Sequence, residues 1–169
     1  MVSRIDLPFS QILSSSTDFI LSQAKQEARR KAISSLPSEY HTPITDYQAS
    51  LLNTPLPLLI PSIRSQEVHP LDVLVAYGKR AIQAHAETNC LTEIMIAEED
   101  KRLGKDSELS GTVRQGGRRP LEGMPVSLKD TVSVKGYESC IGYSGWVGIH
   151  KPHDAPMVKL LRDAGKHPI

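Results

Sequence analysis

The sequence predicts an α/β fold that is mostly helical before residue 90. Two stretches, 17–36 and 70–88, are rich in helix-forming residues, and none of the 11 glycines precedes Gly78. Residues 124–136 instead alternate apolar and polar side chains with the period of a strand. We therefore expect helices first and strands after them.

The first predicted helix spans residues 17–36. Ser16 or Thr17 can cap its start, alanine and long polar side chains fill its middle, and Pro37 ends it. The segment 43–70 then contains the run L-N-T-P-L-P-L-L-I-P. Because proline lacks the N–H that a helix interior needs, we expect this segment to be an extended connector.

A second, amphipathic helix is predicted from Pro70 to about Thr88. Proline is well tolerated in the first turn of a helix. Lys79 and Arg80 are expected to point away from the core. The residues that recur at helical spacing and mark the opposite, inward face are Leu71, Leu74, Val75, Gly78, Ile82 and His85.

Between this helix and the predicted strands the pattern is weaker. Residues 91–96 fit either a short strand or a continuation of the helix, and periodicity does not separate the two. The charged run 97–105 predicts a short exposed helix that ends at Gly104. The polar, glycine-containing stretch 107–119 is typical of a flexible loop.

The last elements are predicted strands and one helix. The apolar positions of the strand pattern within 124–136 are Val126, Leu128, Val132 and Val134. A final helix is expected to start at Asp154, a favourable N-cap residue, and to end at Gly165.

Composition excludes several classes of protein. The chain has 169 residues, 20 Lys+Arg against 19 Asp+Glu, 39% hydrophobic and 5% aromatic residues, which gives neither a basic footprint for nucleic acid nor an acidic tail. The two cysteines, Cys90 and Cys140, form no C-x-x-C pair, so we expect a reducing compartment. We expect Cys140 to be a small buried residue and not a nucleophile. With no signal-like or 20-residue apolar run, the sequence predicts a soluble, cytoplasmic protein.

Lys129 is the strongest candidate for chemistry. It lies between Leu128 and Asp130, near the end of an expected buried strand that Gly123 and Pro125 introduce. A lysine in an apolar, partly desolvated site loses its proton more readily and can act as a general base. From spacing alone, a solvent-facing lysine that discourages edge pairing is the more common alternative.

Three blocks of sequence, in order along residues 71–165, resemble the amidase signature family, and in particular its fungal acetamidase-type branch. The central block is R-R-P-L-E-G-M-P-V-S-L-K-D-T-V-S-V-K-G-Y-E-S-C-I-G-Y, which contains Lys129. The upstream block is V-L-V-A-Y-G-K-R-A-I-Q-A-H-A-E-T-N-C-L-T-E-I, and the downstream block is K-P-H-D-A-P-M-V-K-L-L-R-D-A-G.

This resemblance implies a fold and an activity. It implies a mixed β-sheet flanked by helices, and hydrolysis of a small carboxamide to carboxylate and ammonia by a Ser-cisSer-Lys arrangement in which Lys129 is the base. It implies no metal or organic cofactor. We expect no nucleic-acid or membrane partner, and a homo-oligomer is compatible with the resemblance. Residues 71–169 would form a partial amidase domain, and residues 1–70 a helical, proline-rich extension.

The sequence departs from the family pattern at the serines. No G-G-S-S-G-type run occurs in the 169 residues, and the chain ends at K-H-P-I. We therefore interpret the chain as the N-terminal portion of a truncated amidase that is inactive alone. The alternative is a non-catalytic protein that acts as an interaction module.

Other candidate sites have simpler explanations. Ser127 and Lys129 on one strand face would lie about 6.5–7 Å apart, beyond hydrogen-bond reach. Ser22 and Lys25 match S-x-x-K on an expected surface helix, but neither S-D-N nor K-T-G follows. His150 and His153 lack further metal ligands nearby.

Overall fold

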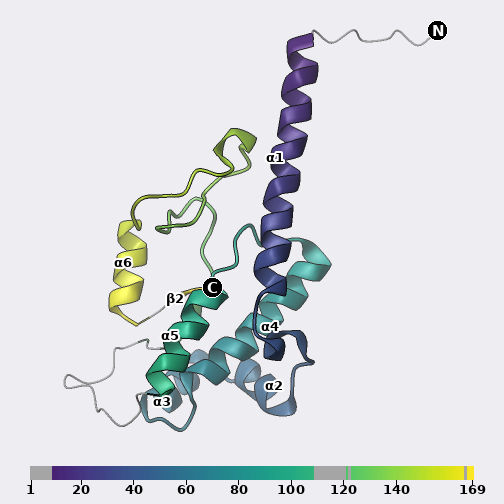
Figure 1. Ribbon diagram of the computed structural model, residues 1–169. Coiled ribbons are helices and arrows are strands. Elements are labelled where there is room, and N and C mark those ends of the chain that lie inside the picture. The colour runs from purple at the N-terminus through teal and green to yellow at the C-terminus, as the bar shows by residue number, and fades with distance from the viewer. Residues whose placement is uncertain (1–8, 109–120, 122, 166) are drawn as a thin grey trace.

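The computed structural model describes residues 9–108, 121, 123–165 and 167–169. Helices dominate these residues, and the strands among them are two of two residues each (Figure 1). None of the described helices is both long enough and apolar enough to cross a membrane. The mostly helical character predicted before residue 90 is confirmed, whereas the described part of the chain builds no larger sheet.

Helix α1 (Phe9–Ser34) begins before the predicted helix and ends two residues before Leu36. Its 26 residues correspond to about 39 Å at 1.5 Å per residue, and its N-terminal half projects beyond the other helices (Figure 1). Near its C-terminus, Arg29 donates hydrogen bonds to the Leu91 carbonyl and to Asn89 Oδ1, each at 2.8 Å. These bonds fasten α1 to the end of the next long helix.

The extended connector predicted for residues 43–70 is wrong, because two helices form within it. Helix α2 (Asp46–Asn53) begins with a capping box, in which Thr45 and Gln48 each satisfy the other's backbone N–H. A short 3-10 helix, η1 (Ser38–His41), precedes it. At the start of α2, the Thr45 and Gln48 side chains supply partners for backbone N–H groups that the first turn of a helix leaves free.

Helix α3 (Leu56–Arg64) forms despite its prolines. Pro57 lies in the first turn, where the helix needs no N–H, and Pro61 lies inside. Leu59 and Ile63, four residues apart, are 1% and 0% exposed. Burial of these two side chains on one helical face outweighs the hydrogen bond that Pro61 removes.

Helix α4 (Pro70–Thr88) confirms the second predicted helix and lies at the centre of the packing. Arg80 is exposed as expected, but the prediction for Lys79 is wrong, because Lys79 is only 2% exposed. Its Nζ donates to Thr42 Oγ1 at 3.0 Å, to the Pro43 carbonyl at 3.2 Å and to Gln48 Oε1 at 2.9 Å. These three oxygens replace the water that the ammonium loses on burial.

The apolar core consists of two clusters that share α4. The first joins α2, α3 and α4 with Met124, through Leu51, Leu59, Ile63, Val73 and Ala76. The second joins η1 and α4 with the residues that follow α4, through Leu36, Tyr40, Val75, Ile94 and Ile96. Residues from both sides of position 70 therefore pack in one core.

Residues 91–95 form neither a strand nor a helical continuation, and helix α5 (Ile96–Glu108) starts after them. Gly104 does not end α5, contrary to prediction, because the helix continues to Glu108. Of the loop predicted at 107–119, residues 109–119 lie outside the described residues and 107–108 are helical.

Strand β1 (Pro125–Val126) pairs in parallel with β2 (His167–Pro168). The strands predicted throughout 124–136 are therefore wrong beyond Val126. A strand needs a neighbour to satisfy its backbone groups, and among the described residues β1 has only the two residues of β2. The following backbone turns instead.

Helix α6 (Pro156–Asp163) confirms the final helix, but its N-cap is Ala155 and not Asp154. The Asp154 carboxylate accepts the Lys135 N–H at 2.8 Å and pairs with Arg162 Nε at 3.3 Å. It therefore joins α6 to the segment after β1.

Candidate active-site segment

Lys129 lies three residues after the end of β1 and is exposed to solvent. Its carbonyl accepts the Val132 N–H at 2.8 Å, which closes a turn. The buried strand end expected around Lys129 is wrong because β1 stops at Val126. Among the described residues, no side-chain hydrogen bond or ion pair engages its ammonium group.

The residue after Lys129 is firmly held. Ser139, 2% exposed, donates a short hydrogen bond from Oγ to the Asp130 carbonyl. The Ile141 N–H donates to Asp130 Oδ2 at 2.6 Å. Ile141 itself has a φ of +52°, a conformation uncommon for a β-branched residue. Two bonds thus attach the Lys129 turn to residues 139–141.

Backbone bonds attach the same segment to the loop before α6. The Gly136 N–H donates to the Lys151 carbonyl at 2.9 Å, and the Lys151 N–H to the Tyr137 carbonyl at 2.8 Å. The Ala155 N–H donates to the Ser133 carbonyl at 2.8 Å. Together with the Lys135–Asp154 bond, they give residues 133–137 a defined backbone without a sheet.

Tyr137 connects the segment to α5. Burial, together with the charge and hydrogen bond of the Glu98 carboxylate, raises the pKa of the Tyr137 hydroxyl above its ordinary value. Tyr137 is therefore a neutral donor to Glu98 across the physiological pH range.

Glu138 connects the segment to α1. Lys25 forms ion pairs with Glu138, at 2.9 Å, and with Glu93, and the Glu138 N–H donates to Glu93 Oε1 at 3.3 Å. The Lys25 side chain is only 16% exposed, that of Glu138 13% and that of Glu93 22%.

The electrostatics of this cluster favour its charged form. Burial alone would lower the pKa of Lys25, but the hydrogen bonds and charges of Glu93 and Glu138 raise it. Burial would raise the pKa of Glu138, but hydrogen bonds from Lys25, the Cys140 thiol and the Gly148 N–H lower it. Both groups therefore stay ionised around neutral pH.

Cys140 is buried, as predicted, and its thiol donates to Glu138 Oε2 at 3.3 Å. Burial and the neighbouring Glu138 carboxylate raise the pKa of this thiol to about 11. Since the thiolate is the reactive form, Cys140 is unsuited to act as a nucleophile.

A cavity of about 210 Å³ lies beside this cluster, between α1 and residues 92–94 and 136–138. Lys25, Glu93 and Glu138 line it and are paired with one another, so the arrangement is suited to joining segments. His150 also lines it, whereas His153 is exposed next to Asp154. Within the described ranges, no three His, Cys, Asp or Glu side chains are grouped to hold a metal ion.

The structure separates the other sequence candidates. Ser127 is exposed, and neither it nor Lys129 lies on a strand. Lys25, which we interpreted from its motif as a coincidence on a surface helix, is mostly buried in the ion cluster. Sequence reasoning missed Glu93 and Glu138 because no local pattern marks residues that meet only in three dimensions.

The profile of the amidase family, described as "Amidase", matches residues 72–169, more than half of the chain. This chain belongs to the amidase signature family. The amidase match includes Lys129 and all of the segment described above, and it confirms the resemblance noted in the sequence.

Individual amidases are similar over part of their length. The acetamidase of Emericella nidulans is 35% identical over 109 residues, which are 63% of this chain and 19% of that protein. Amidase 1 of Gibberella moniliformis is 40% identical over 95 residues, which are 55% of this chain and 18% of that protein. The chain thus spans about a fifth of the length of these curated relatives.

A solved amidase-family structure has the same fold over this region. A fatty acid amide hydrolase aligns with 91% of this chain and 31% of its own, with a TM-score of 0.76 and 20% sequence identity. The mostly helical arrangement in Figure 1 is therefore part of the amidase signature fold.

Proposed function

We propose that this chain supplies the base of an amidase signature enzyme, and that Lys129 is that base. In a full-length form, Lys129 draws a proton through a bridging serine from a nucleophilic serine, which then attacks the carbonyl carbon of a small carboxamide. As the C–N bond breaks and the acyl-serine ester forms, the proton returns from Lys129 through the bridging serine to the nitrogen, which leaves as ammonia. Water then hydrolyses the ester, which releases the carboxylate and restores the serine hydroxyl. The mixed β-sheet flanked by helices belongs to the same full-length form.

The observation that carries this proposal is the condition of Lys129. Lys129 is exposed and engages none of the described side chains, while Asp130 beside it is anchored by two hydrogen bonds. This turn holds the backbone of Lys129 and leaves its side chain available to a partner. A lysine accepts a proton only as the neutral amine, which desolvation favours, so base catalysis also needs Lys129 to be covered. We propose that further segments of a full-length amidase cover Lys129 and supply the serines.

The 169 residues by themselves are proposed to be inactive. They contain no G-G-S-S-G-type run, and Lys129 alone forms no acyl-enzyme. We expect the purified chain to release no ammonia from acetamide or benzamide above the rate without protein. Release that Lys129→Ala abolishes would contradict this expectation.

A chimera tests the role of Lys129 directly. Residues 72–169 replace the matching segment of the Emericella nidulans acetamidase, and ammonia release from acetamide is measured. We expect an active chimera whose kcat/KM falls by about a hundredfold or more in the Lys129→Ala variant, the contribution typical of general acid–base catalysis.

Lys135→Ala is the matched control for the chimera. Lys135 is an exposed lysine of the same segment, and its bond to Asp154 uses the backbone N–H, which alanine retains. We expect Lys135→Ala to leave kcat/KM unchanged. An active chimera that tolerates Lys129→Ala as well as it tolerates Lys135→Ala would refute the assignment of Lys129.

Exposed apolar side chains favour a second function, that of an interaction module. Six of them, on the loop beside α1 and on α6, are between 42% and 69% exposed: Ile141, Tyr143, Trp146, Ile149, Met157 and Leu160. Exposed apolar area of this kind promotes association. We expect the sedimentation mass of the purified chain to rise with concentration, and a monomer at every concentration would argue against self-association.

A further inference from the structure

We propose that Lys25 is a positioning residue for Lys129, because its ion pairs hold the segment that anchors the Lys129 turn. The catalytic meaning of this link rests on the proposed function, whereas the link itself is a property of the chain. It connects α1, which lies outside the residues that match the amidase profile, to the candidate base.

The first step of the link joins α1 to Glu138. Lys25 Nζ lies 2.9 Å from Glu138 Oε2 and also binds Glu93, which itself accepts the Glu138 N–H. Glu138 is therefore held through both its side chain and its backbone. With side chains at most 22% exposed, these pairs are screened far less than surface pairs.

The second step joins Glu138 to Asp130. Ser139 and Ile141, one and three residues after Glu138, make the two bonds to Asp130. The Glu138 carboxylate also accepts hydrogen bonds from the Cys140 thiol and the Gly148 N–H, so it organises residues on both sides of Ile141. A displacement of Glu138 therefore moves both donors to Asp130, the residue after Lys129.

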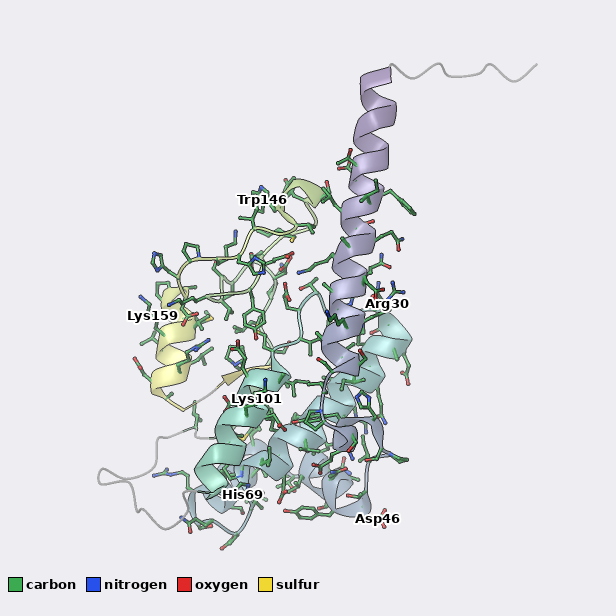
Figure 2. The ribbon with its side chains drawn as sticks, in the orientation of Figure 1. Arg30, Asp46, His69, Lys101, Trp146 and Lys159 are labelled. Atoms are coloured by element: carbon green, nitrogen blue, oxygen red, sulfur yellow. The ribbon has the colours of Figure 1, made fainter. Side chains whose placement is uncertain are left out.

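Two further contacts of α1 do not involve Glu138. Arg29 bonds to Leu91 and Asn89, and Asp18 accepts a hydrogen bond from Ser144 at 2.5 Å. The Asp18 contact holds η2 (Ser144–Trp146), which carries Trp146, beside α1 (Figure 2). These contacts should keep α1 docked when Lys25 is replaced, which allows the effect on residues 130–141 to be measured separately.

Removal of Lys25 leaves Glu93 and Glu138 facing each other without a cation between them. Two like charges in a partly buried site repel, and each has lost water without a compensating partner. Since the Glu138 N–H and Glu93 Oε1 are bonded, the repulsion acts directly on the backbone of the segment. We therefore expect residues 138–141 to separate from Asp130 more often.

Amide hydrogen exchange, followed by NMR on the 169-residue chain, measures that separation. We expect Lys25→Met to accelerate exchange about tenfold or more at the Ile141 N–H, which corresponds to about 1.4 kcal/mol. The Val132 N–H, which closes the Lys129 turn, should accelerate with it. The Ala76 N–H in the core of α4 should keep its protection.

Two variants separate charge from simple packing. Lys31→Met removes an exposed lysine from the same helix and should change none of these rates. Adding Glu138→Gln to Lys25→Met removes one of the two facing carboxylates and should slow exchange at Ile141 again, to about the rate of Glu138→Gln alone, because both variants lack the Lys25–Glu138 pair but neither leaves two carboxylates unpaired. This rescue is the signature of an electrostatic link, because a loss of side-chain packing at Lys25 would persist in the double variant.

Clear results would overturn the proposal. These are unchanged exchange at Ile141 in Lys25→Met, equal acceleration at Ile141 and Ala76, or no rescue in the double variant. If Lys25→Met fails to fold, Glu138→Gln alone, which keeps the Lys25–Glu93 pair, should still accelerate exchange at Ile141, and unchanged exchange there refutes the link. No substrate is involved, so these outcomes are independent of the chimera that tests Lys129.

Discussion

Gly78→Ala is expected to destabilise the protein, although alanine is the better helix former. Gly78 lies inside α4, where the exchange alone would add about 1 kcal/mol of stability. A Cβ at this position would lie 2.7 Å from Tyr40 Cε1 and 3.3 Å from Ile96 Cδ1, whereas ordinary contact begins at 3.4 Å. The Tyr40 ring would have to retreat.

The ring has little freedom to do so. Tyr40 is 3% exposed, and its hydroxyl donates to Asp100 Oδ1 at 2.8 Å, so movement of the ring strains both the packing and this bond. Overpacking of a core costs about 1–3 kcal/mol. Near the upper end of that range, and after the gain in helix propensity, we expect a net loss of about 1–2 kcal/mol.

Urea unfolding followed by far-UV circular dichroism measures this loss, with Gly145→Ala as the control. A Cβ at Gly145 meets no atom within 4 Å, so that substitution should change the free energy of unfolding little. In a Tyr40→Leu background the clash is removed, and Gly78→Ala should become neutral or stabilising. A loss of the same size in both backgrounds would refute the steric explanation.

Two further predictions concern the core and pH. Leu59→Ala should lower the free energy of unfolding by about 2–5 kcal/mol, because Leu59 is 1% exposed in the first core cluster. The adjacent Leu58 is 63% exposed, so Leu58→Ala should lower it by less than about 0.5 kcal/mol. Equal losses in urea unfolding would contradict the assigned core. Burial and the Arg29 charge lower the pKa of His85, whose Nδ1 accepts the Leu91 N–H at 3.1 Å. The stability from neutral His85 is therefore complete above the ordinary pKa near 6.5 and is lost as pH falls through the lower folded value. Between pH 7.5 and 5, Tm should fall more in the natural chain than in His85→Asn, and parallel curves would argue against this role.

Much of the helical structure could be predicted from local sequence. Helix α4 follows from apolar spacing and from Pro70 in its first turn. Helix α6 is predicted from Asp154 as N-cap and from Gly165 after its end, and it forms although its N-cap is Ala155. Helix α3 could not be predicted in this way. Its prolines disfavour a helix locally, and burial of Leu59 and Ile63 against residues from other elements reverses the balance.

The strands show the opposite relation. Alternation in residues 124–136 predicts strands, but only Pro125–Val126 form one. A strand needs a neighbouring strand for its backbone hydrogen bonds, whereas a helix forms them within itself. Beyond Val126, the backbone of residues 127–136 instead forms hydrogen bonds with residues 151–155 and within its own turns. Lys129 consequently lies exposed in a turn and not at the end of a buried strand.

For the candidate site, the sequence by itself determined the family and the identity of the candidate base. Both depend on the order and type of consecutive residues around Lys129, and the profile match over residues 72–169 bears out the family. Only the tertiary structure decided which distant residues support it. Lys25 is separated from Glu93 by 68 positions and from Glu138 by 113, and a single sequence contains no record of pairs at such distances. Lys79, expected in solvent, is likewise buried because Thr42, Pro43 and Gln48 bring three oxygens to its ammonium group. A charged side chain is buried only where folding assembles its partners, and that assembly is a property of the whole chain.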